Sequence, residues 1–216
     1  MKDFFHVDGK FFSIMSKVVD LFLLVLFWIV GCLPIVTIIT STASLYTTVV
    51  KCIRYDRGRV LPEFWEAYRT NLRQGIALTV LYGGIGTAIG CLDYWVFAVS
   101  TNRTGAFLIF AVAAMGLSIV FLLNLLWIAP VFSRFSNTFG NILKLNYVIA
   151  VRNILRSIPM LFLLAAGVIF VLAINELVFI LPSVVVLCLS FLIEPAMRRY
   201  MPKQEEDNGD WRYGFQ

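Results

Sequence analysis

Long runs of apolar residues are the feature that most constrains this chain, because a water-soluble fold cannot bury them. Four runs reach or approach the ~20 apolar residues that cross the hydrocarbon core of a bilayer: 75–98, 106–131, 159–178 and 179–197. Hydrophobic residues make up 60% of the chain and charged residues only 14%, whereas soluble domains carry roughly 25% charged residues. We therefore expect residues 1–200 to form one domain, an all-α polytopic transmembrane helix bundle.

A further apolar stretch, residues 18–53, is too long for one crossing at about 1.5 Å per residue. It is interrupted between Gly31 and Pro34, and a proline inside such a run ends or kinks a helix. We interpret the stretch as a hairpin of two helical segments, which brings the total to six crossings. A single crossing here, giving five in total, is the alternative.

Lysine and arginine residues collect in alternate connections between the apolar segments, as they do in the cytoplasmic loops of membrane proteins. With the amino terminus inside, six crossings place every basic residue except Arg103 in the cytoplasm, whereas five crossings place the basic amino terminus outside. We expect a multi-pass plasma-membrane protein with both termini in the cytoplasm. The polar stretch 201–216 is expected to form a disordered cytoplasmic tail.

Several classes of function are disfavoured by the sequence. The net charge is +5, but the basic residues are scattered between apolar runs, so we expect no nucleic-acid partner. The cysteines stand apart from one another and His6 is the single histidine, so we expect no metal site, disulfide framework or cofactor. The motifs of serine hydrolases, phosphate-binding loops and zinc proteases are missing, so we expect no enzymatic activity.

Two segments between the apolar runs, 61–74 and 139–157, predict amphipathic helices. The first places aromatic residues on one face and most charged residues on the other, and Pro62 suits a first helical turn. Both helices are expected to lie flat on the cytoplasmic surface of the membrane. Because a crossing follows each of them, we interpret the two units as a weak internal repeat, as in many transporters.

Acidic residues within or beside the crossings are the first candidates for a functional role, because a charge at mid-bilayer costs about 2.5–3.5 kcal/mol. We interpret Asp20 and Glu194 as interfacial groups, the second paired with Arg198 one turn later. Glu176 is expected to be solvated in a tight outer turn between the last two crossings. Asp93 lies deeper in its segment. It is either a structural group or a contact for an ion or substrate.

The second segment of the hairpin is rich in hydroxyl groups, which indicates either close helix packing or a polar seam facing a partner subunit or a sugar pathway. The residues that would contact an ion or substrate with Asp93 are Thr37, Thr40, Thr42, Ser44 and Tyr46. The aromatic residues of segment 61–74 either anchor it in the membrane or dock a cytoplasmic protein. The residues of this docking surface would be Phe64, Trp65, Tyr68, Arg69, Arg73, Arg152 and Arg156.

Several stretches, in a consistent order and spacing, resemble the YesL family of bacterial integral membrane proteins. The resemblance covers most of residues 10–200 and rests on segments 33–38, 42–46, 64–71 and 133–135. It implies a protein of Gram-positive bacteria whose gene accompanies those of carbohydrate ABC importers and polysaccharide-degrading enzymes, and hence an accessory role. It supplies no catalytic or binding residues.

The leading hypothesis is a non-enzymatic accessory or partner subunit of a carbohydrate ABC importer, in contact with the lipid bilayer and with the permease or ATPase subunits. The coupling helix of a standard permease carries Glu-Ala-Ala and a glycine four residues later. Glu66-Ala67-Tyr68 has no such glycine, so we do not expect the ATPase to be held in the standard way. The alternative is a small solute transporter or channel that acts on its own, with Asp93 and the hydroxyl residues along its path.

Overall fold

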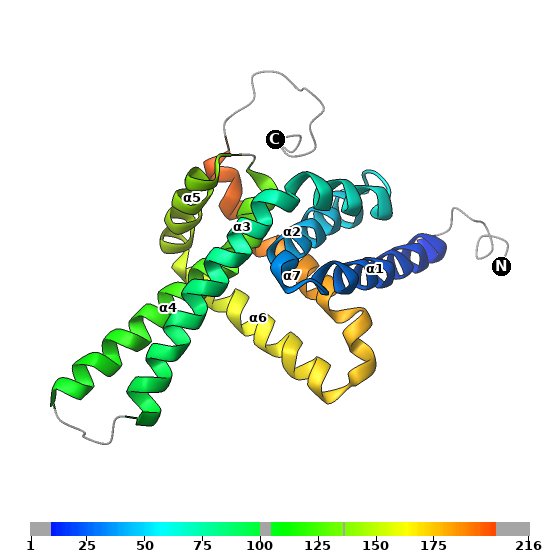
Figure 1. Cartoon of the computed structure of the whole chain (residues 1–216). Coiled ribbons are helices and arrows are strands. Elements are labelled where there is room, and N and C mark those ends of the chain that lie inside the picture. Colours follow the sequence, from blue (N-terminus) through cyan, green and yellow to red (C-terminus); the bar gives the residue numbers. More distant parts are fainter. Residues whose placement is uncertain (1–9, 100–104, 136, 202–216) are drawn as a thin grey trace.

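The computed structural model describes residues 10–99, 105–135 and 137–201, and within these ranges every regular element is helical. Figure 1 shows the order and placement of the helices. The α-helices are α1 (Lys10–Cys32), α2 (Ile38–Thr48), α3 (Val60–Tyr94), α4 (Gly105–Arg134), α5 (Phe139–Arg152), α6 (Ile154–Ala173) and α7 (Leu181–Met197). Shorter 3-10 or π-helical turns are η1 (Ile35–Thr37), η2 (Val49–Arg54), η3 (Trp95–Val99), η4 (Asn175–Phe179) and η5 (Arg198–Tyr200).

Six helical segments in the described part of the chain are long and apolar enough to cross a membrane. They are Met15–Cys32, Ile35–Arg54, Val60–Ala98, Leu108–Arg134, Ile154–Ala173 and Leu181–Tyr200. The predicted all-α bundle is confirmed, and the chain is a multi-helix membrane protein. The turn expected around Glu176 is also present, as η4. His6, Arg103 and the predicted tail after residue 201 lie outside the described residues.

Residues 18–53 form two helices joined at Pro34, as the hairpin interpretation predicted. The Thr37 hydroxyl donates to the carbonyl oxygens of Gly31 and Pro34, both at 2.7 Å, and the first of these is an acceptor that the end of α1 leaves open. Gly31 lies at a close approach of α1 to α2, because a Cβ atom there would come 2.6 Å from the Ser41 hydroxyl. The turn therefore depends on a proline, a glycine and a threonine at fixed positions.

The segment Ile35–Arg54, formed by η1, α2 and η2, is the central helix of the molecule. Of this segment 72% is buried, against 11–39% of the other five candidate spans. It runs antiparallel to the first half of α3, since the Ile39 amide donates to the Thr79 hydroxyl (3.3 Å) and Lys51 pairs with Glu63 (2.5 Å). The Thr40 side chain faces Gly75, where only a glycine allows this approach.

One helix was predicted wrongly. The amphipathic segment 61–74 is not a separate surface helix, because α3 continues through it for 35 residues, a length of about 52 Å. The side of α3 that carries Val60 and Phe64 packs on α1 and α2, and tertiary packing of this kind stabilises a helix beyond its own propensity. The helix continues past Gly75, and this glycine lies at the close contact with α2.

The second predicted amphipathic helix does exist as a separate element, although it ends earlier than expected. Helix α5 ends at Arg152, and α6 then starts at Ile154 instead of residue 159. Several α5 side chains are buried against the bundle, including Ile142 and Ile149 in its main apolar core. The helix therefore packs against the protein, and does not rest only on the membrane surface.

Two pairs of helices extend away from α2 in different directions (Figure 1). Helices α3 and α4 form one arm at the lower left of the view, and α6 with α7 forms the other at the lower right. Large apolar side chains are exposed along both arms, for example on Ile109 and Phe162. Such surfaces suit contact with lipid or with another transmembrane protein.

Candidate functional site: a buried charged cluster where three helices meet

A charged cluster lies where α2, α4 and α7 meet. The Glu194 Oε1 atom accepts hydrogen bonds from the Tyr46 hydroxyl (2.9 Å) and from Arg134 Nε (3.0 Å). Its other oxygen, Oε2, lies 2.5 Å from Arg134 Nη2. Tyr46, Arg134 and Glu194 are only 3%, 2% and 2% exposed. We call these three residues the central cluster.

The sequence prediction for Glu194 was wrong in two respects. The carboxylate is not an interfacial group, and its ion-pair partner is Arg134 instead of Arg198. A buried charge has to be paired, and the partner can come from any helix that packs on the same side. The helical face that carries Trp127 and Val131, both fully buried, continues to Arg134 and brings it to Glu194.

A second basic residue ties the end of the central helix to α7. Arg54 Nη1 donates to the carbonyl oxygen (2.7 Å) and the hydroxyl (3.1 Å) of Ser190. The guanidinium carbon of Arg54 also lies 4.4 Å from the centroid of the Phe191 ring. Because both oxygens of Glu194 have donors and Arg54 has acceptors, the arrangement holds helices together and does not present a reactive group.

The hydroxyl residues of the central helix are largely used within the protein. Thr42 donates to the carbonyl oxygen of Ile38 (2.8 Å) and Ser44 to that of Thr40 (2.9 Å), while Tyr46 belongs to the central cluster. The Thr40 hydroxyl is buried without a hydrogen-bond partner within the described residues. These contacts support the helix-packing interpretation of the segment over the open polar seam.

Asp93 lies near the end of α3, apart from the central cluster. The Ser118 hydroxyl of α4 donates to Asp93 Oδ2 at 2.7 Å, while Oδ1 is buried with no hydrogen-bond partner in the described part of the chain. The pair joins the two helices of one arm. The structure thus gives Asp93 a structural contact and leaves one of its oxygens available to a further donor.

A polar contact that the sequence did not predict joins α3, α4 and α5. Asn146 Nδ2 donates to the Tyr82 hydroxyl (2.9 Å) and to the Asn124 carbonyl oxygen (3.0 Å), and Asn146 is fully buried. Its spacing from Ile142 and Ile149 is the signal that could have placed it on the buried face of α5.

The predicted docking residues do not form one surface. Phe64 is 2% exposed and packs against α1 and α2, so its assignment to an exposed face was wrong. Three nearby residues of α3 do form a group as the predicted docking surface requires. Trp65 stacks on Tyr68 (centroids 5.8 Å apart), and the Arg69 guanidinium carbon lies 4.7 Å from the Trp65 ring centroid. Arg73 is also exposed on α3.

The other two predicted docking residues lie elsewhere. Arg152 is exposed at the end of α5, and Arg156, in the first turns of α6, is half-buried. Figure 1 places this junction on the opposite side of α2 from the first turns of α3. The docking surface supported by the geometry is therefore the α3 group alone, Trp65, Tyr68, Arg69 and Arg73.

Comparison with known protein families gives one match. Residues 21–94 match the family described as "Protein of unknown function, DUF624". This is the family of the YesL-like proteins, and the match covers about a third of the chain. No curated protein and no solved structure matches the chain. The matched region contains Tyr46 and the α3 docking surface, whereas Arg134 and Glu194 lie beyond it.

Proposed function

We propose that the chain is a non-enzymatic integral membrane protein that acts as an accessory or partner subunit of a carbohydrate ABC importer in the plasma membrane. The observation that carries this proposal is the hydrogen bonding of the polar side chains on the central helix. Its hydroxyl groups and its tyrosine are engaged mainly inside the chain, so they serve packing. The surfaces left for function are those that another protein would contact.

Two such surfaces support the proposal. The apolar arms expose many large side chains, and the α3 docking surface presents a stacked tryptophan, tyrosine and arginine. Tryptophan, tyrosine and arginine are the residue types that most often dominate binding energy at protein interfaces. The YesL resemblance, with its gene association, supplies the kind of partner.

Co-purification tests the proposal. The full chain, tagged and expressed with the importer subunits encoded beside it, is extracted in mild detergent, and the captured proteins are identified by mass spectrometry. The permease or ATPase subunits should be recovered with the wild-type chain and reduced with Trp65→Ala or Arg69→Gln. Recovery of the tagged chain alone would refute the proposal.

The chain offers a matched control for this experiment. Trp95, in η3 at the other end of α3, is 63% exposed, and Trp65 is 47% exposed. Trp95→Ala removes the same side chain from the same helical run, so it should leave the recovery unchanged if the α3 docking surface binds the partner. An equal loss of importer subunits with both variants would assign the contact to the apolar arms instead.

The alternative is a small solute transporter or channel, and the Asp93 carboxylate favours it. An acidic group near a span with one unpartnered oxygen is the type of group that binds ions or protons in transporters. Proteoliposomes that contain only this chain would then take up solute, and Asp93→Asn would abolish uptake. Ser118→Ala, which removes the donor to Asp93 Oδ2 and keeps the charge of Asp93, should retain the uptake.

A further inference from the structure

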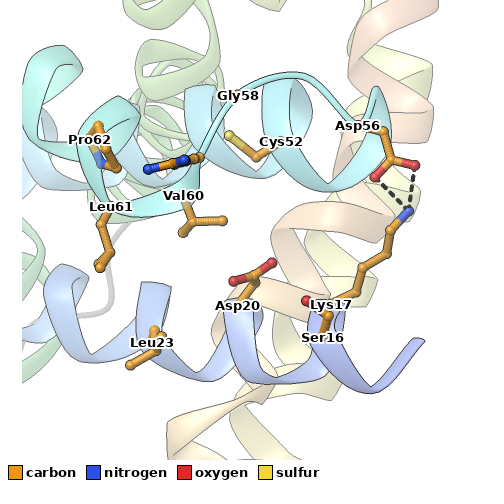
Figure 2. Close-up of a pocket in the computed structure, with 11 residues that line it drawn as sticks. Ser16, Lys17, Asp20, Leu23, Cys52, Asp56, Gly58, Val60, Leu61 and Pro62 are labelled. Atoms are coloured by element: carbon orange, nitrogen blue, oxygen red, sulfur yellow. Dashed lines mark hydrogen bonds and ion pairs between the residues drawn. The ribbon is translucent and has the colours of Figure 1, made fainter. Parts of the chain in front are cut away.

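A cavity of about 840 Å³ lies between the first turns of α1 and the connection from η2 to α3 (Figure 2). Cavities of roughly 300–1,000 Å³ commonly hold small ligands. On the α1 side it is lined by Ser16, Lys17, Asp20 and Leu23. On the other side it is lined by Cys52, Asp56, Gly58, Arg59, Val60, Leu61 and Pro62.

The walls of this cavity are fixed by contacts within the chain. Lys17 Nζ lies 3.0 Å from Asp56 and joins the two walls at one end, as Figure 2 shows. Gly58 adopts a φ of 84°, and a Cβ atom there would lie 2.7 Å from Glu63 Oε1, so the loop requires glycine. Glu63 is in turn held by Lys51. These contacts therefore fix the shape of the cavity.

Two opposite charges face the cavity without a partner. The side chains of Asp20 and Arg59 make no hydrogen bond or ion pair with the described part of the chain, although both residues line the same space. Figure 2 shows the Asp20 carboxylate directed from α1 toward the opposite wall, near Val60. The cavity therefore matches a ligand that carries one cationic and one anionic group.

The position of the cavity narrows the ligand class further. Charged groups this dense belong at the membrane interface, because they are expensive in the hydrocarbon core. Leu23, Val60 and Leu61 line the same cavity, and α1 exposes Phe22 beside it and Phe27 beyond it. A ligand at this depth can place its polar end in the cavity and its apolar chains along α1, as a phospholipid does.

We propose that this cavity binds the head group of phosphatidylethanolamine, with the ammonium group on Asp20 and the phosphate on Arg59. A guanidinium matches phosphate geometry and can form two parallel hydrogen bonds with it. The primary ammonium donates N–H groups to a carboxylate, which the trimethylammonium of phosphatidylcholine does not. Phosphatidylglycerol lacks a cation for Asp20.

Native mass spectrometry of the full chain tests this site. The protein is released from micelles that contain equal amounts of phosphatidylethanolamine, phosphatidylcholine and phosphatidylglycerol. Because a hydrogen bond to a charged group contributes about 1.5–3 kcal/mol, we expect phosphatidylethanolamine to be retained in preference by at least about tenfold. Asp20→Asn should remove that preference, whereas Arg59→Gln should weaken the retention of all three lipids, because each of them carries the phosphate. Equal retention of the three lipids by the wild-type chain would overturn the proposal.

Control variants and a soluble competitor separate the alternatives. Glu66→Gln and Arg73→Gln change exposed charges of α3 outside the cavity, so they should keep the preference. Loss of the preference in these controls as well would show a general charge effect and contradict the site. Glycerophosphoethanolamine carries the same head group without acyl chains; if it displaced the lipid at equal concentration, the ligand would be a soluble zwitterion and not a lipid.

Discussion

Glu194→Gln is expected to be among the most damaging single substitutions in the chain. The variant keeps the size of the side chain and an oxygen that can accept from the Tyr46 hydroxyl, but it removes the negative charge that forms the ion pair with Arg134. Arg134 is 2% exposed, so this ion pair is broken in the protein interior. Breaking a buried ion pair in this way costs about 3–5 kcal/mol.

The expected change in melting temperature follows from that free energy. For a protein of this size each kcal/mol lowers the melting temperature by about 2–4 °C, so Glu194→Gln should lower it by roughly 6–20 °C. The assay is size-exclusion chromatography of the detergent-solubilised chain after heating at a fixed rate. Glu66→Gln, at an exposed position of α3, serves as the matched control and should leave the melting temperature unchanged.

Removing the arginine of this ion pair should lower the melting temperature less than Glu194→Gln does. Arg134→Met leaves the Glu194 carboxylate, which can become neutral by binding a proton, whereas a guanidinium cannot lose one in a protein. The double variant Arg134→Met with Glu194→Gln has no buried charge left in this pair and should melt above the Glu194→Gln single variant. A Glu194→Gln melting temperature within about 2 °C of the wild type would refute the reasoning.

Two further predictions concern helix contacts. Gly75→Ala should lower the melting temperature, because its Cβ atom would collide with the Thr40 side chain, whereas Gly90→Ala should keep or raise it, since no atom lies within 4 Å of that position. Asn146→Leu leaves the Tyr82 hydroxyl and the Asn124 carbonyl oxygen without their donor, which should cost about 1–2 kcal/mol, measured with the same heating assay. If Gly75→Ala and Gly90→Ala melted alike, the close approach of α2 and α3 would be contradicted.

The helices were predictable because their signals are local. Apolar length identifies a span, and Gly31 with Pro34 interrupts a run too long for one helix. The continuation of α3 through residues 61–74 was not predictable in the same way. An amphipathic pattern shows that one face is buried, but it does not say whether lipid or protein covers that face, and for Phe64 it is the α1–α2 hairpin.

The central cluster could not be derived from spacing within one helix. Arg134 and Glu194 stand 60 positions apart in the sequence, and an i,i+4 search selects Arg198 instead. Only the packing of α4 and α7 against α2 brings the two side chains together. Tyr46 was selected from the sequence as part of a polar segment, and the structure explains its polarity by the Glu194 carboxylate that it contacts.

The mass and composition of the complex extracted from the native membrane test the central claim most directly. Native mass spectrometry after mild-detergent purification should show this chain bound to importer subunits in a fixed ratio, and the complex should weaken when Trp65 and Arg69 are replaced. A monomer or a homo-oligomer that carries no importer subunit, with wild-type and variant chains alike, would contradict the claim that the chain is an accessory subunit.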